Sequence, residues 1–282
     1  MSIYTGKETY IHDNSLPHAM LSSTLQWYNP SMAFKEKKLQ RKALTYSLAG
    51  DQLYYRIYGN GKPLVLLHGY GVSGHVWQRS IPYLARQRQV IVVDLPGHGR
   101  STLQGPWRLR AIAPLLATWL QELELEPAAL VGHSMGGAIA VHLAAFTLCE
   151  RLILVNAAAL PLQETLLTMS LRSLRSMAQR GGGGYPLALL RDVLKPRPRL
   201  HWQAAQEMIQ SDFRAELAQL AATPLPILII WGTRDPLLPL SFGEDLSKTL
   251  PQAIFTTMPQ SGHRPPLSEP EKFSRLVLEF LE

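Results

Sequence analysis

Residues 132–137, with the sequence GHSMGG, constrain the fold of this chain more than any other segment. An apolar run at 128–131 comes directly before them, and a helix-forming run at 138–148 follows. A strand, a G-x-S-x-G turn and a helix in this order make a sharp turn that lifts the serine hydroxyl out of a sheet. Small residues on both sides of the serine permit that turn. The sequence therefore predicts a reactive Ser134 at the positive end of a helix.

Strands and helices alternate along most of the chain. This alternation predicts an α/β fold with a mostly parallel sheet and helices on both faces. A hairpin of 44–48 and 52–58 is expected to add an antiparallel edge. Further strands are expected at 63–67, 89–93, 128–131, 151–155, 224–231 and 253–258, and helices at 76–85, 109–123 and 269–281.

One long interval, 158–223, separates two expected strands where a single crossover helix would suffice. It contains three helical patterns, at 162–179, 186–194 and 202–221, and is rich in leucine and methionine. We interpret it as a helical cap over the end of the sheet that carries Ser134; the alternative is a peripheral helical layer. The predicted organisation is an N-terminal extension (1–42), a core (43–157 and 224–282) and an inserted cap (158–223).

The composition is that of a globular protein, with 46% hydrophobic and 17% charged residues in 282. No apolar run approaches the roughly 18 residues of a membrane-spanning helix. The first residues lack the basic and apolar regions of a secretory signal, so a cytoplasmic location is expected. The single cysteine, Cys149, excludes an internal disulfide and is expected to be a small core residue.

The formal net charge is +7, and basic residues concentrate in two segments, 35–42 and 172–199. The simplest interpretation is that these basic residues lie on a solvent-exposed surface of the protein. The alternatives are attraction to an acidic substrate, an acidic partner or an anionic membrane surface. Because no recognition motif accompanies the charge, no nucleic acid is expected as a partner. The oligomeric state is left open.

A reactive serine needs a base to accept its proton and an acid to orient that base. His263 follows the last expected strand and precedes the last helix, and in an open parallel sheet catalytic groups gather beyond the carboxyl ends of the strands. We predict His263 as the base. The side chain of His133 should diverge from that of its neighbour Ser134. The other histidines are assigned structural or peripheral places: His12, His18, His68, His75, His98, His142 and His201.

Asp235 stands at the end of another expected strand and is predicted to be the acid; its alternative role is a turn or helix cap before Pro236. Asp94 also ends a strand, but it leads a Pro-Gly-His-Gly loop and is interpreted as a turn former. Asn156 ends the strand after the predicted serine helix and cannot supply a charge. The chain order is then Ser134, Asp235, His263.

An oxyanion hole needs two backbone N–H donors. The N–H of Met135 lies next to the serine. The loop His68-Gly69-Tyr70-Gly71 follows a predicted strand, and the N–H of Tyr70 is the candidate for the second donor. Its glycines, Gly69 and Gly71, permit close approach, and His68 is expected to support the loop.

These pieces together resemble the α/β-hydrolase superfamily, in its lipase- and esterase-like branch with a helical cap. The resemblance covers about 44–282 and rests on residues 68–71, 94–101, 132–137, 231–235 and 261–263. It implies the α/β-hydrolase fold, the chain order Ser-Asp-His and an acyl-enzyme mechanism that needs no metal or organic cofactor. Its relatives with an aspartate nucleophile do not match Ser134.

The leading hypothesis is hydrolysis of a carboxylic ester of a small to medium apolar substrate, which is anionic if the arginines of 172–199 lie nearby. A C–C bond hydrolase of a ketonic substrate would use the same three residues. A ligand-binding protein on the hydrolase scaffold is the non-catalytic alternative. The bond type and the natural substrate remain open at this stage.

Overall fold

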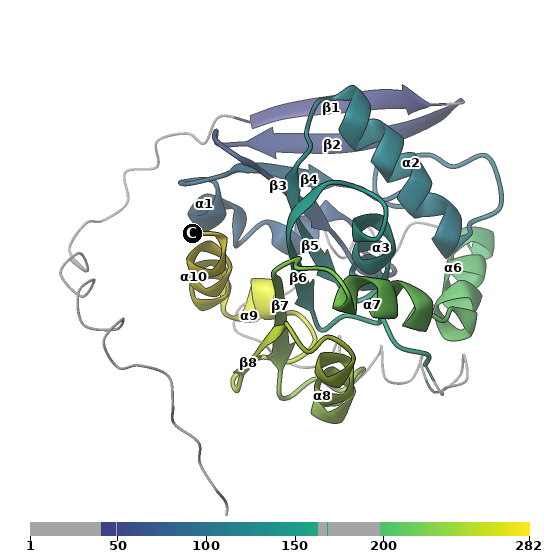
Figure 1. Ribbon diagram of the computed structural model, residues 1–282. Coiled ribbons are helices and arrows are strands. Elements are labelled where there is room, and N and C mark those ends of the chain that lie inside the picture. The colour runs from purple at the N-terminus through teal and green to yellow at the C-terminus, as the bar shows by residue number, and fades with distance from the viewer. Residues whose placement is uncertain (1–40, 49, 163–167, 169–197) are drawn as a thin grey trace, which may run out of the picture. The chain divides into compact units, whose positions relative to one another are not determined.

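Continuous runs of Val, Ile and Leu form the centre of an eight-stranded sheet (Figure 1). The computed structural model describes residues 41–48, 50–162, 168 and 198–282. The strand order is β1-β2-β4-β3-β5-β6-β7-β8, and β2 runs in the opposite direction to the other strands of this sheet. The strands are β1 (Arg41–Leu48), β2 (Asp51–Tyr58), β3 (Pro63–Leu67), β4 (Gln89–Val93), β5 (Ala128–His133), β6 (Cys149–Val155), β7 (Ile227–Gly232) and β8 (Ile254–Met258).

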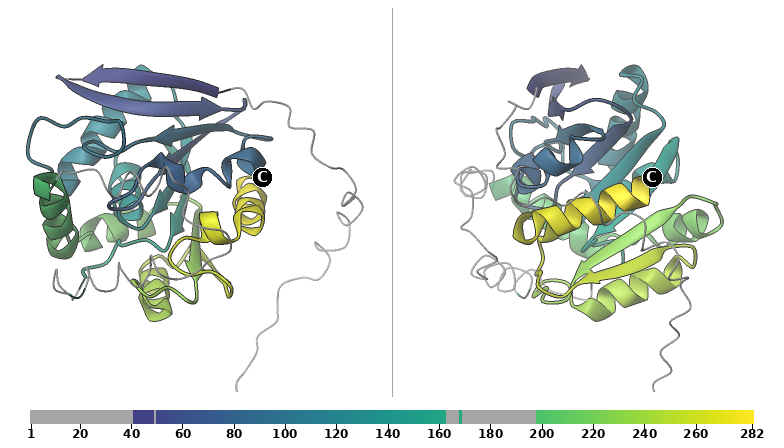
Figure 2. Two further views of the ribbon diagram at one scale, coloured as in Figure 1. Left: turned by 180° about the vertical axis from the view of Figure 1, so that it is seen from behind. Right: turned by 90° about the vertical axis from the view of Figure 1, so that its left-hand side faces the viewer.

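Helices cover both faces of this sheet, as Figure 2 shows. One face packs against α2, α3, α6, α7 and α8, and the other packs against η2, α1 and α10. The bounds are η2 (Gly74–Trp77), α1 (Ile81–Leu84), α2 (Leu109–Glu122), α3 (Met135–Ala144), α6 (Pro198–Gln210), α7 (Arg214–Ala221), α8 (Leu240–Thr249), α9 (Pro265–Ser268) and α10 (Pro270–Leu281). The α/β fold with an antiparallel hairpin at one edge is thereby confirmed.

The parallel strands decide where polar loop residues meet. Strands β3, β5, β6, β7 and β8 all run in the same direction, so the residues that follow them lie along one edge of the sheet. His68, Ser134 and Asn156 follow β3, β5 and β6 directly. The loops after β7 and β8 carry Asp235 and His263. Residues that are far apart in the sequence are thus brought to a common edge.

Several element boundaries differ from the sequence predictions. The single helix expected at 76–85 is two short turns, η2 and α1, because Pro82 has no N–H to continue a helix through this point. The helix expected at 202–221 is divided into α6 and α7, and between them the Asp212 carboxylate accepts a hydrogen bond from the N–H of Arg214. Helix α3 ends at Ala144, and Cys149 begins β6 as a half-buried residue.

Two predicted segments lie outside the described residues. The N-terminal extension is one of them up to residue 40, and β1 begins at Arg41. The other is most of the first two cap helices, 162–179 and 186–194. Within the described part of the chain, no helix combines the length and apolar character needed to cross a membrane.

Candidate active site

Ser134 occupies a strained turn between β5 and α3. Its φ of 54° is in the left-handed region, and its side chain is almost entirely buried. The Ser134 N–H donates to the carbonyl of Val155 at 3.0 Å, and the Ser134 carbonyl accepts from Gly137 at 2.9 Å. A Cβ at position 132 would lie 2.4 Å from the carbonyl oxygen of Gly136. The turn therefore requires glycine beside the serine, and the structure holds an outlying backbone conformation at this residue.

Asp235 and His263 meet in a buried hydrogen bond. Nδ1 of His263 lies 2.7 Å from Oδ2 of Asp235, and neither side chain is more than 8% exposed. The other carboxylate oxygen accepts the N–H groups of Leu237 at 2.7 Å and Leu238 at 3.1 Å. Since a carboxylate only accepts, Nδ1 of His263 carries the proton and Nε2 is left as the basic nitrogen. The loops after β7 and β8 thus fix the orientation of the imidazole.

The loop of His263 also contacts the turn that holds Ser134. Nε2 of His133, the residue before the serine, lies 2.7 Å from the backbone carbonyl of His263. Among the described residues, no hydrogen bond links the hydroxyl of Ser134 to His263. Catalytic hydrogen bonds are often long when no substrate is bound. The proton transfer from Ser134 to His263 therefore stays a prediction.

Asn156, to which the sequence assigned no catalytic role, belongs to the same cluster as Asp235 and His263. It is fully buried, with φ of 41°, and its Nδ2 donates to Oδ2 of Asp235 at 2.6 Å. Its Oδ1 accepts the N–H of Gly232 at 3.1 Å. The side chain therefore joins the end of β6 to the end of β7 and to the carboxylate. In the sequence, the position of Asn156 at the end of an expected strand was the feature that could have indicated its place in the site.

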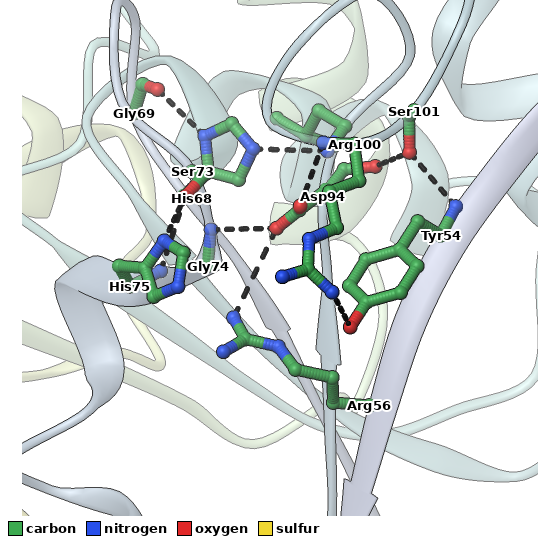
Figure 3. Close-up of polar contacts among 11 residues, drawn as sticks. Tyr54, Arg56, His68, Gly69, Ser73, Gly74, His75, Asp94, Arg100 and Ser101 are labelled. Atoms are coloured by element: carbon green, nitrogen blue, oxygen red, sulfur yellow. Dashed lines mark hydrogen bonds and ion pairs between the residues drawn. The ribbon is translucent and has the colours of Figure 1, made fainter. Parts of the chain in front are cut away.

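The loop after β3 lies against the serine. A Cβ at Gly69 would be 3.1 Å from Cβ of Ser134, which shows how closely this backbone approaches. His68 holds the loop in place, with Nδ1 at 2.8 Å from the Gly69 carbonyl and Nε2 at 2.9 Å from the N–H of Leu95. Gly71 has φ of 70°, in the region that favours glycine. His68 thus makes hydrogen bonds to the loop after β3 and to the residue that follows Asp94 (Figure 3).

Asp94 ties the loops after β3 and β4 together, as Figure 3 shows. One carboxylate oxygen accepts the N–H of Gly74 at 2.9 Å, and the other accepts the N–H of Arg100 at 3.0 Å. The buried guanidinium of Arg56, in β2, lies 3.9 Å from this carboxylate. The residue interpreted from sequence as a turn former is thus also a buried anchor for two loops.

Helix α6 lies against these loops. The Tyr70 hydroxyl donates to the carbonyl of His201 at 3.1 Å, and burial raises the pKa of Tyr70 above its ordinary value. The ring of His201 packs edge-on against Tyr70 and against His98, with ring centroids 5.7 and 5.9 Å apart. Leu200 lies over Gly97. The last part of the 158–223 interval therefore covers the loops that follow β3 and β4.

Comparison with known proteins agrees with this architecture. A model of the alpha/beta hydrolase family matches residues 64–276. The "Magnesium-chelatase 30 kDa subunit" of Rhodobacter capsulatus is 32% identical over 257 residues, 79% of this chain and 88% of that protein. The "Pimeloyl-[acyl-carrier protein] methyl ester esterase" of Chromobacterium violaceum is 32% identical over 256 residues, 82% of this chain and 98% of that protein.

Solved structures show the same fold. An esterase from Thermogutta terrifontis superposes with a TM-score of 0.69 and 26% sequence identity, and the match covers 86% of this chain and 98% of that one. The family model spans most of the chain, including every strand from β3 to β8. The chain belongs to the alpha/beta hydrolase family.

Proposed function

We propose that this protein hydrolyses carboxylic esters through an acyl-enzyme on Ser134, with His263 as general base and Asp235 as its orienting acid. The observation that carries the proposal is the buried hydrogen bond of 2.7 Å between His263 and Asp235, on a loop that contacts the Ser134 turn. A bound carboxylate that holds one imidazole tautomer is what a serine nucleophile requires of its base.

The proposed reaction uses these residues in the following order. Nε2 of His263 takes the Ser134 proton as Oγ attacks the carbonyl carbon of the ester. The tetrahedral intermediate collapses, and the leaving alcohol receives that proton from His263. Water then attacks the acyl-enzyme, gives a proton to His263 and releases the carboxylic acid, while Oγ of Ser134 recovers its proton. Asp235 stabilises the imidazolium at each step.

The oxyanion is assigned to the backbone N–H groups of Met135 and Tyr70. Met135 is the first residue of α3, where unpaired N–H groups and the helix dipole favour negative charge. Tyr70 follows Gly69, whose backbone closely approaches Ser134. One such donor contributes about 3 kcal/mol to stabilisation of the transition state.

We place the substrate between the Ser134 turn and the cap of 158–223. Support comes from α6, which packs on Tyr70 and His98. The proposed substrate is a small to medium apolar acyl ester. The relative from Chromobacterium violaceum is named as an esterase of a pimeloyl-[acyl-carrier protein] methyl ester, and an ester is the class of bond proposed for this chain.

The replacement of Ser134 by alanine tests this function with a series of p-nitrophenyl esters of increasing acyl length. We expect the wild-type protein to hydrolyse them and Ser134→Ala to lose at least about a thousandfold in kcat, because the nucleophile is absent. Circular dichroism and thermal unfolding check that the variant is folded. Turnover by Ser134→Ala equal to wild type would overturn the proposal.

The relative from Rhodobacter capsulatus is named as a subunit of another enzyme, so a partner-binding role is the outcome that this assay must separate. The ester series is therefore extended to thioesters and amides of the same acyl lengths. A folded wild-type protein that turns over none of these substrates would favour the partner-binding role.

A further inference from the structure

His133 is a buried imidazole that the proposed chemistry does not use. It is the last residue of β5, directly before Ser134, and is 1% exposed. Its Nε2 is 2.7 Å from the backbone carbonyl of His263. A carbonyl oxygen only accepts hydrogen bonds, so Nε2 of His133 carries the proton and is the donor.

The ring of His133 fits between two loops of the site. On one side, its centroid is 4.9 Å from that of His263. On the other side, a Cβ at Gly69 would be 3.1 Å from Nδ1 of His133. Trp77 packs edge-on against it, with centroids 6.2 Å apart. Nδ1 is buried and has no hydrogen-bond partner within the described part of the chain. The interaction with the His263 carbonyl is therefore the polar contact that orients the ring.

The surroundings of His133 keep it neutral. Burial lowers its pKa well below the ordinary histidine value, and His263, Arg264 and His68 oppose a positive charge from the loops after β8 and β3. The hydrogen bond to the His263 carbonyl acts in the opposite direction but does not prevail. The donor at Nε2 is thus present in the neutral tautomer, without dependence on protonation.

We propose that His133 is a positioning residue, which sets the place of the His263 imidazole by holding the backbone carbonyl of that residue. The inference rests on the proposed function. Asp235 fixes the ring of His263 through Nδ1, but it leaves the backbone of the loop to be held elsewhere. His133 holds the backbone carbonyl of His263 itself, directly from the residue before the nucleophile. A displacement of about 1 Å between catalytic groups costs on the order of a hundredfold in rate.

Glutamine and asparagine at position 133 separate positioning from packing. The amide nitrogen of Gln is as many bonds from Cα as Nε2 of His, so His133→Gln restores the donor. That of Asn is one bond shorter and corresponds to Nδ1, so His133→Asn is the matched control, and His133→Leu removes the donor. We expect Gln to keep kcat within about threefold of wild type, and Asn and Leu to lower kcat about 10- to 100-fold with KM unchanged.

Rates are to be expressed per active site, counted by fluorophosphonate labelling, so that partial unfolding is not mistaken for slow catalysis. Loss of activity in the Gln variant equal to that in the Leu variant would overturn the inference. So would a Leu variant with wild-type kcat.

Proton and ¹⁵N NMR of histidine-labelled protein provide a readout that needs no substrate. In the wild type we expect a protonated Nε2 and a bare Nδ1 at His133; the opposite tautomer would contradict the inference even if every variant failed to fold. The downfield proton shared by His263 and Asp235 should be kept in His133→Gln and broadened or shifted in His133→Leu, and an unchanged signal in Leu would count against positioning. If wild type hydrolyses no ester but these signals behave as expected, the proposed function fails and the positioning contact stands.

Discussion

Asn156 connects three parts of the site with one amide group. It donates to Asp235 and accepts from Gly232, and its own backbone has φ of 41°. An amide is suited to this place because it both donates and accepts and because Asn tolerates the left-handed region. The orientation of the Asp235 carboxylate therefore depends on a residue that takes no proton in the reaction.

Replacement of Asn156 by glycine removes these hydrogen bonds without straining the backbone. We expect kcat on an activated ester to fall about tenfold, because the carboxylate loses a donor that fixes it. The free energy of unfolding should fall by about 1–3 kcal/mol, since the N–H of Gly232 loses its acceptor. Steady-state kinetics and urea unfolding measure the two effects.

Asn156→Asp is the companion variant. It places a second carboxylate beside Asp235, and two such groups cannot both be ionised at this distance without a large cost. It should lose more activity than Asn156→Gly at neutral pH. Wild-type kcat in the glycine variant would show that Asp235 needs no support from this residue.

At this scale the sequence predicted much of the cluster, for physical reasons. Ser134 is marked by its glycines, and Asp235 and His263 each follow an apolar strand, so the shared edge of the sheet brings them together. The Asp235–His263 contact is observed, while the participation of Ser134 remains a prediction. Asn156 was set aside because it bears no charge, although hydrogen-bonding capacity was the property that mattered.

The loops after β3 and β4 depend on one carboxylate, that of Asp94. It accepts two backbone N–H groups and lies beside Arg56, whose Nε and Nη2 have no hydrogen-bond partner among the described residues. A buried guanidinium whose charge partner is removed is left uncompensated. Replacement of Asp94 should therefore weaken the attachment of the loop after β3, which carries the candidate oxyanion donor Tyr70.

Asp94→Asn should lower the free energy of unfolding by about 3 kcal/mol, because it removes a negative charge beside buried Arg56 and one of the two carboxylate acceptors. The control is Arg56→Met, alone and combined with Asp94→Asn. In the Met background we expect Asp94→Asn to cost at least about 1 kcal/mol less, which denaturant unfolding of the four proteins measures. Strictly additive losses would show that Asp94 and Arg56 do not interact.

The order of strands and helices was predictable from periodicity, but some boundaries were not. Helix α10 buries Phe273, Val277 and Leu281 on one face, as the amphipathic pattern at 269–281 indicated. Helix α8 is absent from the sequence predictions; it is short, largely polar and contains Gly243. That glycine packs onto Trp231, where a Cβ would lie 2.5 Å from the indole. The glycine is needed because α8 packs closely against β7. Such packing between elements cannot be seen in a single sequence.

Buried histidines link the stability of the whole molecule to pH. Burial lowers the pKa of His133 well below 6.5, and it also lowers the pKa of His142 in α3. Below about pH 6.5 the unfolded chain binds more protons at these residues than the folded chain does. The contribution of these histidines to the free energy of unfolding is therefore complete at a pH above their pKa in the unfolded chain. It is lost progressively as the pH falls toward their pKa in the folded protein.

For His133, whose pKa lies well below the ordinary value, the free energy of unfolding should fall by up to about 1.4 kcal/mol per pH unit as the pH drops below about 6.5, and the lowered pKa of His142 adds to this loss. Urea unfolding at about pH 7 and about pH 5.5 measures the slope. His133→Gln, which keeps a donor but cannot titrate, should lose less stability over this interval than wild type. Equal losses in the two proteins would show that His133 titrates alike in both states.

The central claim, that Ser134 is the nucleophile, is tested most directly by mass spectrometry of the folded protein after reaction with a fluorophosphonate. We predict a single phosphonyl adduct on the peptide that contains Ser134, and no adduct in Ser134→Ala. Ester hydrolysis that persists while Ser134 stays unmodified, or an adduct on another residue that abolishes activity, would contradict the account.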